Sequence, residues 1–219
     1  VGPNKEITLI LHNNFFPNDS YINNETKLLL LDKCDSIVFV SKYLKNEFFK
    51  NLNIKDRNNV HVIYNVISKK NTFNKRKKKL IIFSGKLNKS KGYHIFGRAI
   101  IKILNEHTDW KALVIGNEKR EQYFFSHKNL VIKDWVSHDK IIKYYDIASI
   151  SVVNPTWNEP FGRTALESSS RGCAVITSKS GGINETFKNN LILKHNNVST
   201  LYKKIKYLIQ NNSILKKIQ

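Results

Sequence analysis

The sequence predicts an α/β protein with a doubly wound parallel sheet, and two features carry this prediction. Short runs of Val, Ile and Leu, which are typical of buried parallel strands, alternate with segments of helical periodicity along the whole chain. The alternation runs in two series separated by a cationic stretch, which indicates two lobes. Hydrophobic residues make up 41% of the 219-residue chain, enough for a folded core.

The first series of elements occupies residues 1–66. Its expected elements are strands at 6–12, 36–41 and 60–65 and helices at 23–34 and 42–52. Residues 67–79 follow, with almost no apolar content and a dense run of Lys and Arg. Such a segment is typical of an exposed linker, and a nucleic-acid-binding signal is the alternative interpretation.

The second series occupies residues 80–219. Strands are expected at 80–85, 110–116, 130–135, 149–154 and 173–178, and helices at 92–105, 138–148, 162–172 and 198–219. In a doubly wound sheet, ligands bind beyond the carboxyl ends of the strands, where loops and helix N-termini meet. Three strand-to-helix junctions of this series carry polar residues suited to a site.

The net charge bears on the choice of partner. It is +20, from 37 basic and 17 acidic residues. Such an excess favours anionic partners, namely nucleic acid, acidic membranes or phosphorylated small molecules. Lys, Asn, Ile, Tyr and Phe are all abundant, so the alternative is an AT-rich codon bias that leaves the lysines as solvated surface.

The two cysteines and the start of the chain suggest further expectations. Cys34 and Cys173 lie far apart and match no metal or disulfide pattern, so buried free thiols in a reducing compartment are expected. The chain has no Met and opens with Val-Gly-Pro, from which we expect a processed product or a piece of a longer protein.

The first junction is the loop that follows the strand at 80–85. Gly85 ends that strand, and Lys86 and Lys91 lie on the loop that enters the next helix. Lysine ammonium groups beside the free N–H groups of a helix N-terminus suit a diphosphate. The alternative is an ordinary lysine-rich surface loop.

The second junction holds two carboxylates. Pro160 favours extended backbone at Glu159 and presets the φ angle for a helix start. Glu167 follows eight positions after Glu159, roughly two helical turns along. The alternatives are that Glu159 complements the helix N-terminus and that Glu167 pairs with Arg163 or Arg171.

The third junction is a pair of glycines, Gly181 and Gly182, after the strand at 173–178. Paired glycines allow the backbone to approach a ligand closely, and a plain turn is the alternative.

Together these motifs resemble the C-terminal half of the retaining glycosyltransferases of family 4, which have the GT-B fold. That family carries Glu-x7-Glu within E-P-F-G-x-x-x-L-E, then a small-residue helix, G-x-P-V-I and G-G-x-x-E. The matching positions are Glu159, Pro160, Phe161, Gly162, Leu166, Glu167, Gly172, Val175, Ile176, Gly181, Gly182 and Glu185. Residues 34–48 and 60–67 also resemble the end of the family's N-terminal domain, so the resemblance covers about residues 1–210.

The resemblance implies a domain plan. Residues 1–66 would be the last βα elements of an N-terminal, acceptor-side Rossmann-like domain, and residues 67–79 a basic linker. Residues 80–219 would be the C-terminal Rossmann-like domain that binds a nucleotide sugar.

The resemblance also implies roles for the carboxylates. Glu167 would hold the ribose hydroxyls of the nucleotide, and Glu159 would contact and position the donor sugar. The backbone near Phe161 and Gly162 would border the sugar and the diphosphate, as would Gly85.

Basic and aromatic residues complete the implied site. Lys86 and Lys91 match a basic pair that neutralises the diphosphate. The family usually has Arg at the first position, so Lys86 keeps the charge but loses bidentate geometry. Trp135 and Val136 align with the segment that flanks the nucleobase, and His12 matches a histidine that faces the donor sugar.

The implied reaction is retaining transfer of a hexose from a UDP-, GDP- or ADP-sugar to a polysaccharide or glycolipid acceptor. The lysines and a helix N-terminus would stabilise charge on the departing diphosphate. The acceptor would attack from the leaving-group face, so no nucleophilic carboxylate pair is needed. No Asp-x-Asp occurs, and no metal is expected.

The expected location is the cytoplasm, with a lipid-linked acceptor and the lysine cluster at 75–79 drawing the protein to the anionic inner face of the membrane. The second hypothesis is a non-catalytic basic module derived from this fold that binds nucleotide or nucleic acid. The aromatic-rich signatures of RNA-binding modules are missing, which argues against nucleic acid.

The chain departs from the family pattern in three ways. The motif reads GGINE instead of Gly-Gly-x-Pro-Glu, and the segment after it lacks the family's glycine-rich turn. The glycine-rich loop of the N-terminal domain and most of the acceptor site have no counterpart here. If the chain is truncated, we therefore expect it to bind nucleotide sugar poorly and to be inactive alone.

Overall fold

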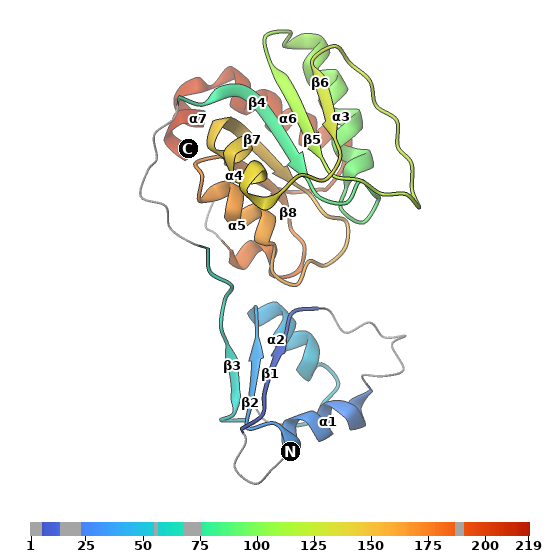
Figure 1. The fold of residues 1–219 in the computed structure, drawn as a ribbon, viewed down its shortest axis with the longest axis vertical. Helices are drawn as coiled ribbons and strands as arrows, with labels where there is room; N and C mark the ends of the chain where they lie inside the picture. The colour runs from blue at the N-terminus through green and yellow to red at the C-terminus, as the bar shows by residue number, and fades with distance from the viewer. Residues whose placement is uncertain (1–5, 14–22, 55–56, 68–75, 187–190) are drawn as a thin grey trace.

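The computed structural model describes residues 6–13, 23–54, 57–67, 76–186 and 191–219. Their strands form two parallel sheets, one in each series (Figure 1). Helices cover both faces of the larger sheet, so the predicted α/β class with a doubly wound parallel sheet is confirmed. Most of the predicted linker at 67–79 lies outside the described residues, and the domain division at 1–66 and 80–219 stays a prediction.

The described residues up to 67 form a small lobe with a three-stranded sheet in the order β1-β2-β3. Its elements are β1 (Thr8–Leu11), α1 (Asn24–Lys33), β2 (Ser36–Phe39), α2 (Lys42–Phe49) and β3 (Val60–Val62). The core between this sheet and its helices contains Leu31, Phe39 and Phe48, each at most 1% exposed. Ser41 begins α2, because its side chain accepts a hydrogen bond from the backbone N–H of Leu44.

The described residues from 76 onward form a large lobe with a six-stranded sheet. Its elements are β4 (Lys78–Ser84), α3 (Tyr93–Glu106), β5 (Lys111–Ile115), β6 (Leu130–Lys133), α4 (His138–Ile147), β7 (Ala148–Val153), α5 (Arg163–Ser169), β8 (Ala174–Ser178), the 3₁₀-helix η1 (Gly181–Glu185), β9 (Ile192–Leu193), α6 (Val198–Gln210) and α7 (Asn212–Ile218). The strand β4 therefore begins inside the predicted linker.

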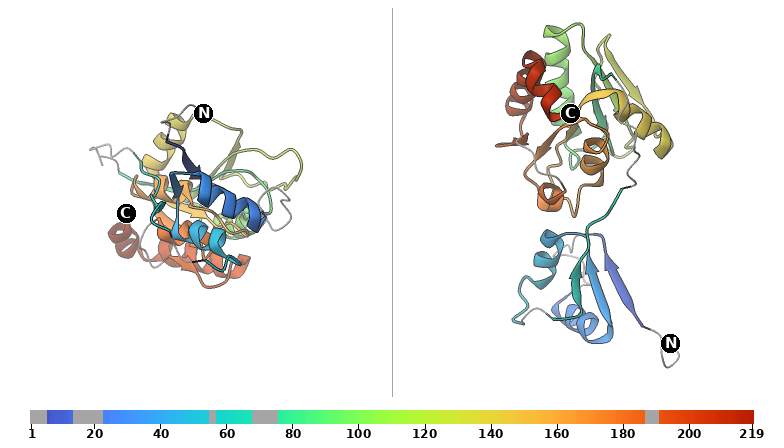
Figure 2. Two further views of the ribbon diagram at one scale, coloured as in Figure 1. Left: turned by 90° about the horizontal axis from the view of Figure 1, so that it is seen from below. Right: turned by 90° about the vertical axis from the view of Figure 1, so that its left-hand side faces the viewer.

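Two apolar layers hold this sheet. On one face α3, α6 and α7 pack around Phe96, Ile100 and Ile205, and on the other α4 and α5 pack against Ile82 and Val175. Figure 2 shows the green α3 and the red C-terminal helices on one side of the sheet and the yellow α4 on the other. A continuous Val/Ile/Leu strand pattern produces this arrangement because both faces of the strands are buried.

The strand order places a switch point beside β4. The sheet runs β6-β5-β4-β7-β8-β9, so the chain winds outward from β4 in one direction and returns to continue from β7 in the other. Register pairs Ile81 with Ile150 and Ile82 with Ser151. The helices that follow β4 and β7, α3 and α5, lie on opposite faces of the sheet, so a crevice can form between the two loops at this edge, which is where ligands bind in such sheets.

Several helix boundaries differ from the prediction. The helix expected at 42–52 ends at Phe49. The helix expected at 162–172 spans Arg163–Ser169, with Gly162 at a φ of 94° as its N-cap. The C-terminal helix divides at Asn211 into α6 and α7.

Two smaller expectations can also be compared with the structure. Cys34 and Cys173 are buried free thiols, as predicted. In the described part of the chain, no helix combines the length and the apolar character needed to cross a membrane.

Candidate functional site

The loops after β4 and β7 meet at the switch point of the large sheet. Gly85 and Lys91 from the first loop and Glu159 and Gly162 from the second line one small hollow of about 40 Å³. The sequence predicts that Lys86, Lys91, Glu159 and Glu167 converge on one crevice; Lys91 and Glu159 line this hollow, and Lys86 and Glu167 do not.

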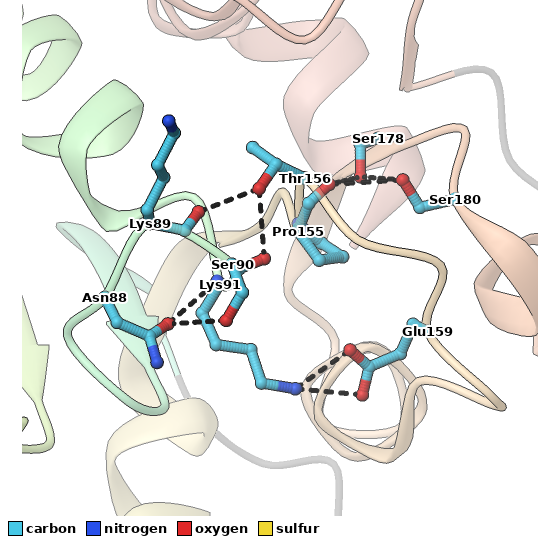
Figure 3. A network of polar contacts seen from close by, with 9 residues as sticks. All are labelled: Asn88, Lys89, Ser90, Lys91, Pro155, Thr156, Glu159, Ser178 and Ser180. Carbon is cyan, nitrogen blue, oxygen red and sulfur yellow. Dashed lines mark hydrogen bonds and ion pairs between the residues drawn. The ribbon is translucent and has the colours of Figure 1, made fainter. Parts of the chain in front are cut away.

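Lys91 and Glu159 form an ion pair within this hollow. The Lys91 ammonium lies 3.0 and 2.8 Å from the two carboxylate oxygens of Glu159 (Figure 3). The Lys91 side chain is 30% exposed and that of Glu159 18%. The same ammonium lies 5.0 Å from the centroid of the Trp157 ring, which adds a cation–π contact.

A buried asparagine shapes the loop that carries Lys91. The Asn88 side-chain oxygen accepts hydrogen bonds from the Lys91 backbone N–H at 3.0 Å and from the Ser90 hydroxyl at 2.9 Å. Gly92 then adopts a φ of 78° and α3 begins at the next residue. This turn aims Lys91 away from α3 and toward the β7 loop.

The β7 loop is held from two sides by hydroxyl groups. Thr156 donates to the Lys89 carbonyl at 2.9 Å, which joins the two loops. Ser178 and Ser180 donate to the Pro155 carbonyl at 2.7 and 3.1 Å, which joins the β7 loop to the loop after β8 (Figure 3). These residues orient Glu159, and sequence reasoning missed them. The signal that could have found them is a run of small polar residues directly after buried strands.

The two glycines of η1 press against the same loop. A Cβ on Gly181 would lie 2.3 Å from the Glu159 carbonyl oxygen, and one on Gly182 would lie 2.3 Å from that of Pro160. The Gly182 N–H also donates to the Glu159 carbonyl at 2.8 Å. The sequence predicts that this pair approaches a ligand, whereas the close approach seen in the structure is to the backbone of the β7 loop.

Glu167 lies on α5 with its side chain 11% exposed. Its carboxylate accepts a hydrogen bond from Arg163 at 3.4 Å and contacts His138, the first residue of α4, at 3.2 Å. Of the two arginines considered as partners, Arg163 is the one used, and Arg171 instead lies 3.7 Å from Asp146. His138 was not anticipated, because its approach depends on how α4 packs beside α5.

A neutral tyrosine lies beneath the site. The Tyr145 hydroxyl hydrogen-bonds to Ser84, the last residue of β4. Burial raises the pKa of this hydroxyl, and the nearby Glu167 carboxylate raises it further. Tyr145 therefore stays protonated near neutral pH and adds no charge to the site.

A much larger cavity of about 870 Å³ lies at the opposite edge of the sheet, lined by Lys79 and Ser149 near the starts of β4 and β7. Its lining contains none of the residues that the motifs single out as ligand contacts. The small hollow is the better candidate, because it lies at the carboxyl ends of the strands. Among the described residues, no group of three or more His, Cys, Asp or Glu is placed to hold a metal ion.

Residues 65–219 match the model of the family described as glycosyl transferases group 1. An uncharacterized glycosyltransferase of Methanocaldococcus jannaschii is 31% identical over 193 residues, which cover 83% of this chain and 52% of that protein. The lipopolysaccharide core biosynthesis mannosyltransferase LpcC of Rhizobium leguminosarum bv. viciae is 32% identical over 111 residues, 46% of this chain and 31% of that protein.

The chain belongs to the glycosyl transferases group 1 family.

The fold agrees with this assignment. A crystal structure of Anabaena HepE in complex with UDP-glucose superposes with a TM-score of 0.79 at 16% identity, covering 98% of this chain and 65% of that one. The predicted GT-B type of fold is thereby confirmed. This group 1 chain spans about half the length of the first curated relative that it matches.

The remaining predicted residues of this glycosyltransferase chain lie outside the lining of the hollow. Lys86 is exposed directly after Gly85, at the same edge of the sheet, and Glu167 is one element away on α5. Trp135 is 53% exposed after β6, and the partly buried Val136 packs against the α4–α5 core layer. His12 is exposed at the end of β1 in the small lobe. Phe161 is 4% exposed in the small-lobe core, so only its backbone remains for ligand contact.

Proposed function

We propose that this chain is the donor-binding part of a retaining glycosyltransferase that transfers a hexose from a nucleotide-diphosphate sugar to a polysaccharide or glycolipid acceptor. The observation that carries the proposal is the meeting of Lys91 and Glu159 at the switch point of the sheet. At that place the Lys91 ammonium would suit the diphosphate of the donor, and the Glu159 carboxylate would suit its sugar hydroxyls. HepE, which shares the fold, was solved with UDP-glucose.

Donor binding requires an exchange of partners. The Lys91 ammonium would leave the Glu159 carboxylate and pair with a diphosphate oxygen, a charge-assisted contact of similar strength. Lys86, exposed at the same edge, would add a second positive charge, and the N-terminus of α3 would add its partial positive charge. As the sugar–phosphate bond breaks, charge grows on the phosphate, so these groups stabilise the transition state more than the ground state.

The exchange also frees Glu159 for the sugar. Its carboxylate would accept hydrogen bonds from sugar hydroxyls and orient the anomeric carbon toward the acceptor. Glu167 would accept the ribose hydroxyls, in place of its present contacts with Arg163 and His138. The acceptor would attack from the face that the diphosphate leaves, which retains the anomeric configuration without a carboxylate nucleophile.

The donor and acceptor are proposed by class. UDP-, GDP- and ADP-sugars share the diphosphate that Lys91 would bind, and Trp135 and Val136 would flank the base. LpcC of Rhizobium leguminosarum is a mannosyltransferase of lipopolysaccharide core biosynthesis, which favours a saccharide or lipid-linked acceptor here. We place the reaction in the cytoplasm at the inner membrane face, where cationic residues would meet anionic headgroups.

Thermal unfolding with UDP, GDP, ADP and their sugars tests the proposal. One nucleotide at a hundredfold excess over its Kd should stabilise the chain by about 2.7 kcal/mol. For a chain of this size, that raises the melting temperature by roughly 5–10 °C. Glu167→Ala should lose most of this shift, because the ribose hydroxyls lose their acceptor, whereas Glu25→Ala, on the surface of α1, should keep it.

Thermal unfolding with nucleotides also distinguishes the second hypothesis, a non-catalytic basic module, from the glycosyltransferase proposal. The charge of +20 is the feature that supports a basic binding module. Salt-sensitive binding of RNA, together with melting temperatures that no nucleoside diphosphate changes, would support that module and reject the glycosyltransferase proposal.

A further inference from the structure

One carboxylate of the large lobe binds the small lobe. Glu185, the last residue of η1, accepts hydrogen bonds from the backbone N–H groups of Lys42 and Tyr43, each at 2.8 Å. It also accepts one from the Tyr64 hydroxyl at 3.0 Å. Three donors on two segments of the small lobe therefore converge on a single side chain from the other lobe.

The two backbone donors need a hydrogen-bond acceptor from outside their own helix. Lys42 and Tyr43 are the first two residues of α2, whose N–H groups have no acceptor within the helix. A carboxylate at this position also complements the positive end of the helix dipole. Burial and the hydrogen bond to Glu185 raise the pKa of the Tyr64 hydroxyl, so it stays protonated and remains a donor.

The same junction reaches the loop that carries Glu159. Ser41, the N-cap of α2, donates from its hydroxyl to the Pro160 carbonyl at 2.5 Å. Gly182 lies between the two lobes, because a Cβ there would approach the Pro160 carbonyl oxygen at 2.3 Å and the Ser41 side chain at 2.9 Å. The ring of Tyr64 lies 6.1 Å from that of Phe161.

We propose that Glu185 is a positioning residue that fixes the N-terminus of α2 and Tyr64 against the Glu159–Phe161 backbone, and thereby sets the orientation of the small lobe over the candidate donor site. An acidic residue is required because one side chain must accept several hydrogen bonds at a helix N-terminus. Gly182 is required because any side chain there would separate Ser41 from Pro160.

The role in orientation stands on geometry alone, whereas the consequence for transfer rests on the proposed function. A small lobe held in one orientation would keep the acceptor side of the site aligned with the donor sugar. Misalignment should therefore slow the transfer step, since small displacements of reacting groups have large effects on rate. Donor binding should change little, because Lys91 and Glu159 both belong to the large lobe.

Distances between the lobes provide the first test. Spin labels attached to cysteines introduced at Lys33 on α1 and Lys102 on α3, both exposed, would be measured by pulsed electron paramagnetic resonance in the full chain. A narrow distance distribution is expected for the parent chain and a broad one for Glu185→Ala. Glu185→Gln should lie between them, because its amide oxygen still accepts hydrogen bonds without the charge. Glu25→Ala, which removes a carboxylate from the small lobe alone, should match the parent.

Nucleotide binding and transfer provide the second test. Glu185→Ala should retain the melting shift produced by the nucleotide that stabilises the parent chain, and the retained shift also shows that the variant is folded. Its kcat for sugar transfer or donor hydrolysis should fall about tenfold or more, with KM for the donor within about twofold. Glu185→Gln should recover part of the kcat.

The outcomes distinguish the two claims. A distance distribution for Glu185→Ala as narrow as that of the parent overturns the positioning role, whatever the activity. If no nucleotide shifts the melting temperature of the parent, the proposed function fails, and the distance measurement still decides the role of Glu185.

Discussion

Replacing Lys91 with alanine is expected to remove the nucleotide-dependent melting shift and to lower kcat for sugar transfer by about 10²–10³-fold, the loss typical for a group that stabilises transition-state charge. The variant lacks the ammonium that would neutralise the diphosphate. It also leaves the Glu159 carboxylate, only 18% exposed, without its ion-pair partner at the same place. The remaining negative charge would repel the donor. Thermal shift and initial-rate measurements on the variant test both effects.

Two further variants isolate the cause. Lys89→Ala removes a neighbouring exposed lysine whose backbone, and not its side chain, joins the loops, so it should behave as the parent. Lys91→Ala combined with Glu159→Gln should regain part of the nucleotide-dependent shift, since the repelling charge is gone, but not the transfer rate. Nucleotide binding by Lys91→Ala equal to that of the parent would reject the assigned role of Lys91.

Gly92→Ala is expected to cause the second large effect, a loss of about 2–5 kcal/mol in the free energy of unfolding. Gly92 has a φ of 78°, which L-residues adopt at a cost. A Cβ would also lie 2.0 Å from the Asn154 carbonyl oxygen, where the loops after β4 and β7 come together. Urea denaturation monitored by far-ultraviolet circular dichroism measures the loss.

Gly85→Ala is the matched control for this substitution. Gly85 also has a positive φ, at 147°, but no heavy atom among the described residues lies within 4 Å of a Cβ placed there. Its cost should therefore be that of the backbone conformation alone. A loss for Gly92→Ala below about 2 kcal/mol, no more than a left-handed φ costs by itself, would mean that the loops do not meet as described.

The regular elements were predictable because their signals are local. The apolar period from Ile95 to Ile103 predicts a helix at 92–105, and α3 spans Tyr93–Glu106. The apolar run at 110–116 predicts a strand, and β5 spans Lys111–Ile115. Both patterns act within a few residues and were not overridden by packing.

The segment around α5 shows what local signals leave out. The helix predicted at 162–172 begins one residue later, at Arg163, and ends at Ser169. Phe161, two residues before this helix, is buried in the core of the other lobe. A residue pattern read along one segment cannot contain a contact with a distant core.

Part of the candidate site was also predictable from the sequence, and part was not. The order of the motifs predicted that the loops after β4 and β7 carry a basic residue and a carboxylate to one crevice, which follows from strand order in a doubly wound sheet. The ion pair between Lys91 and Glu159 joins residues 68 positions apart, and its formation was not predicted. The contacts of Asn88 and Thr156 that aim these side chains were also not predicted.

The sequence by itself determined the fold class, the family and the edge of the sheet at which the candidate site lies. This was possible because periodicity, turn residues and motif order are properties of short segments of the chain. Only the tertiary structure decided that Lys91 is held by Glu159 and that Glu185 reaches α2, a contact across 143 positions. Such contacts depend on how the two lobes and their loops pack, since a hydrogen bond forms only when its donor and acceptor atoms come within about 3 Å of each other.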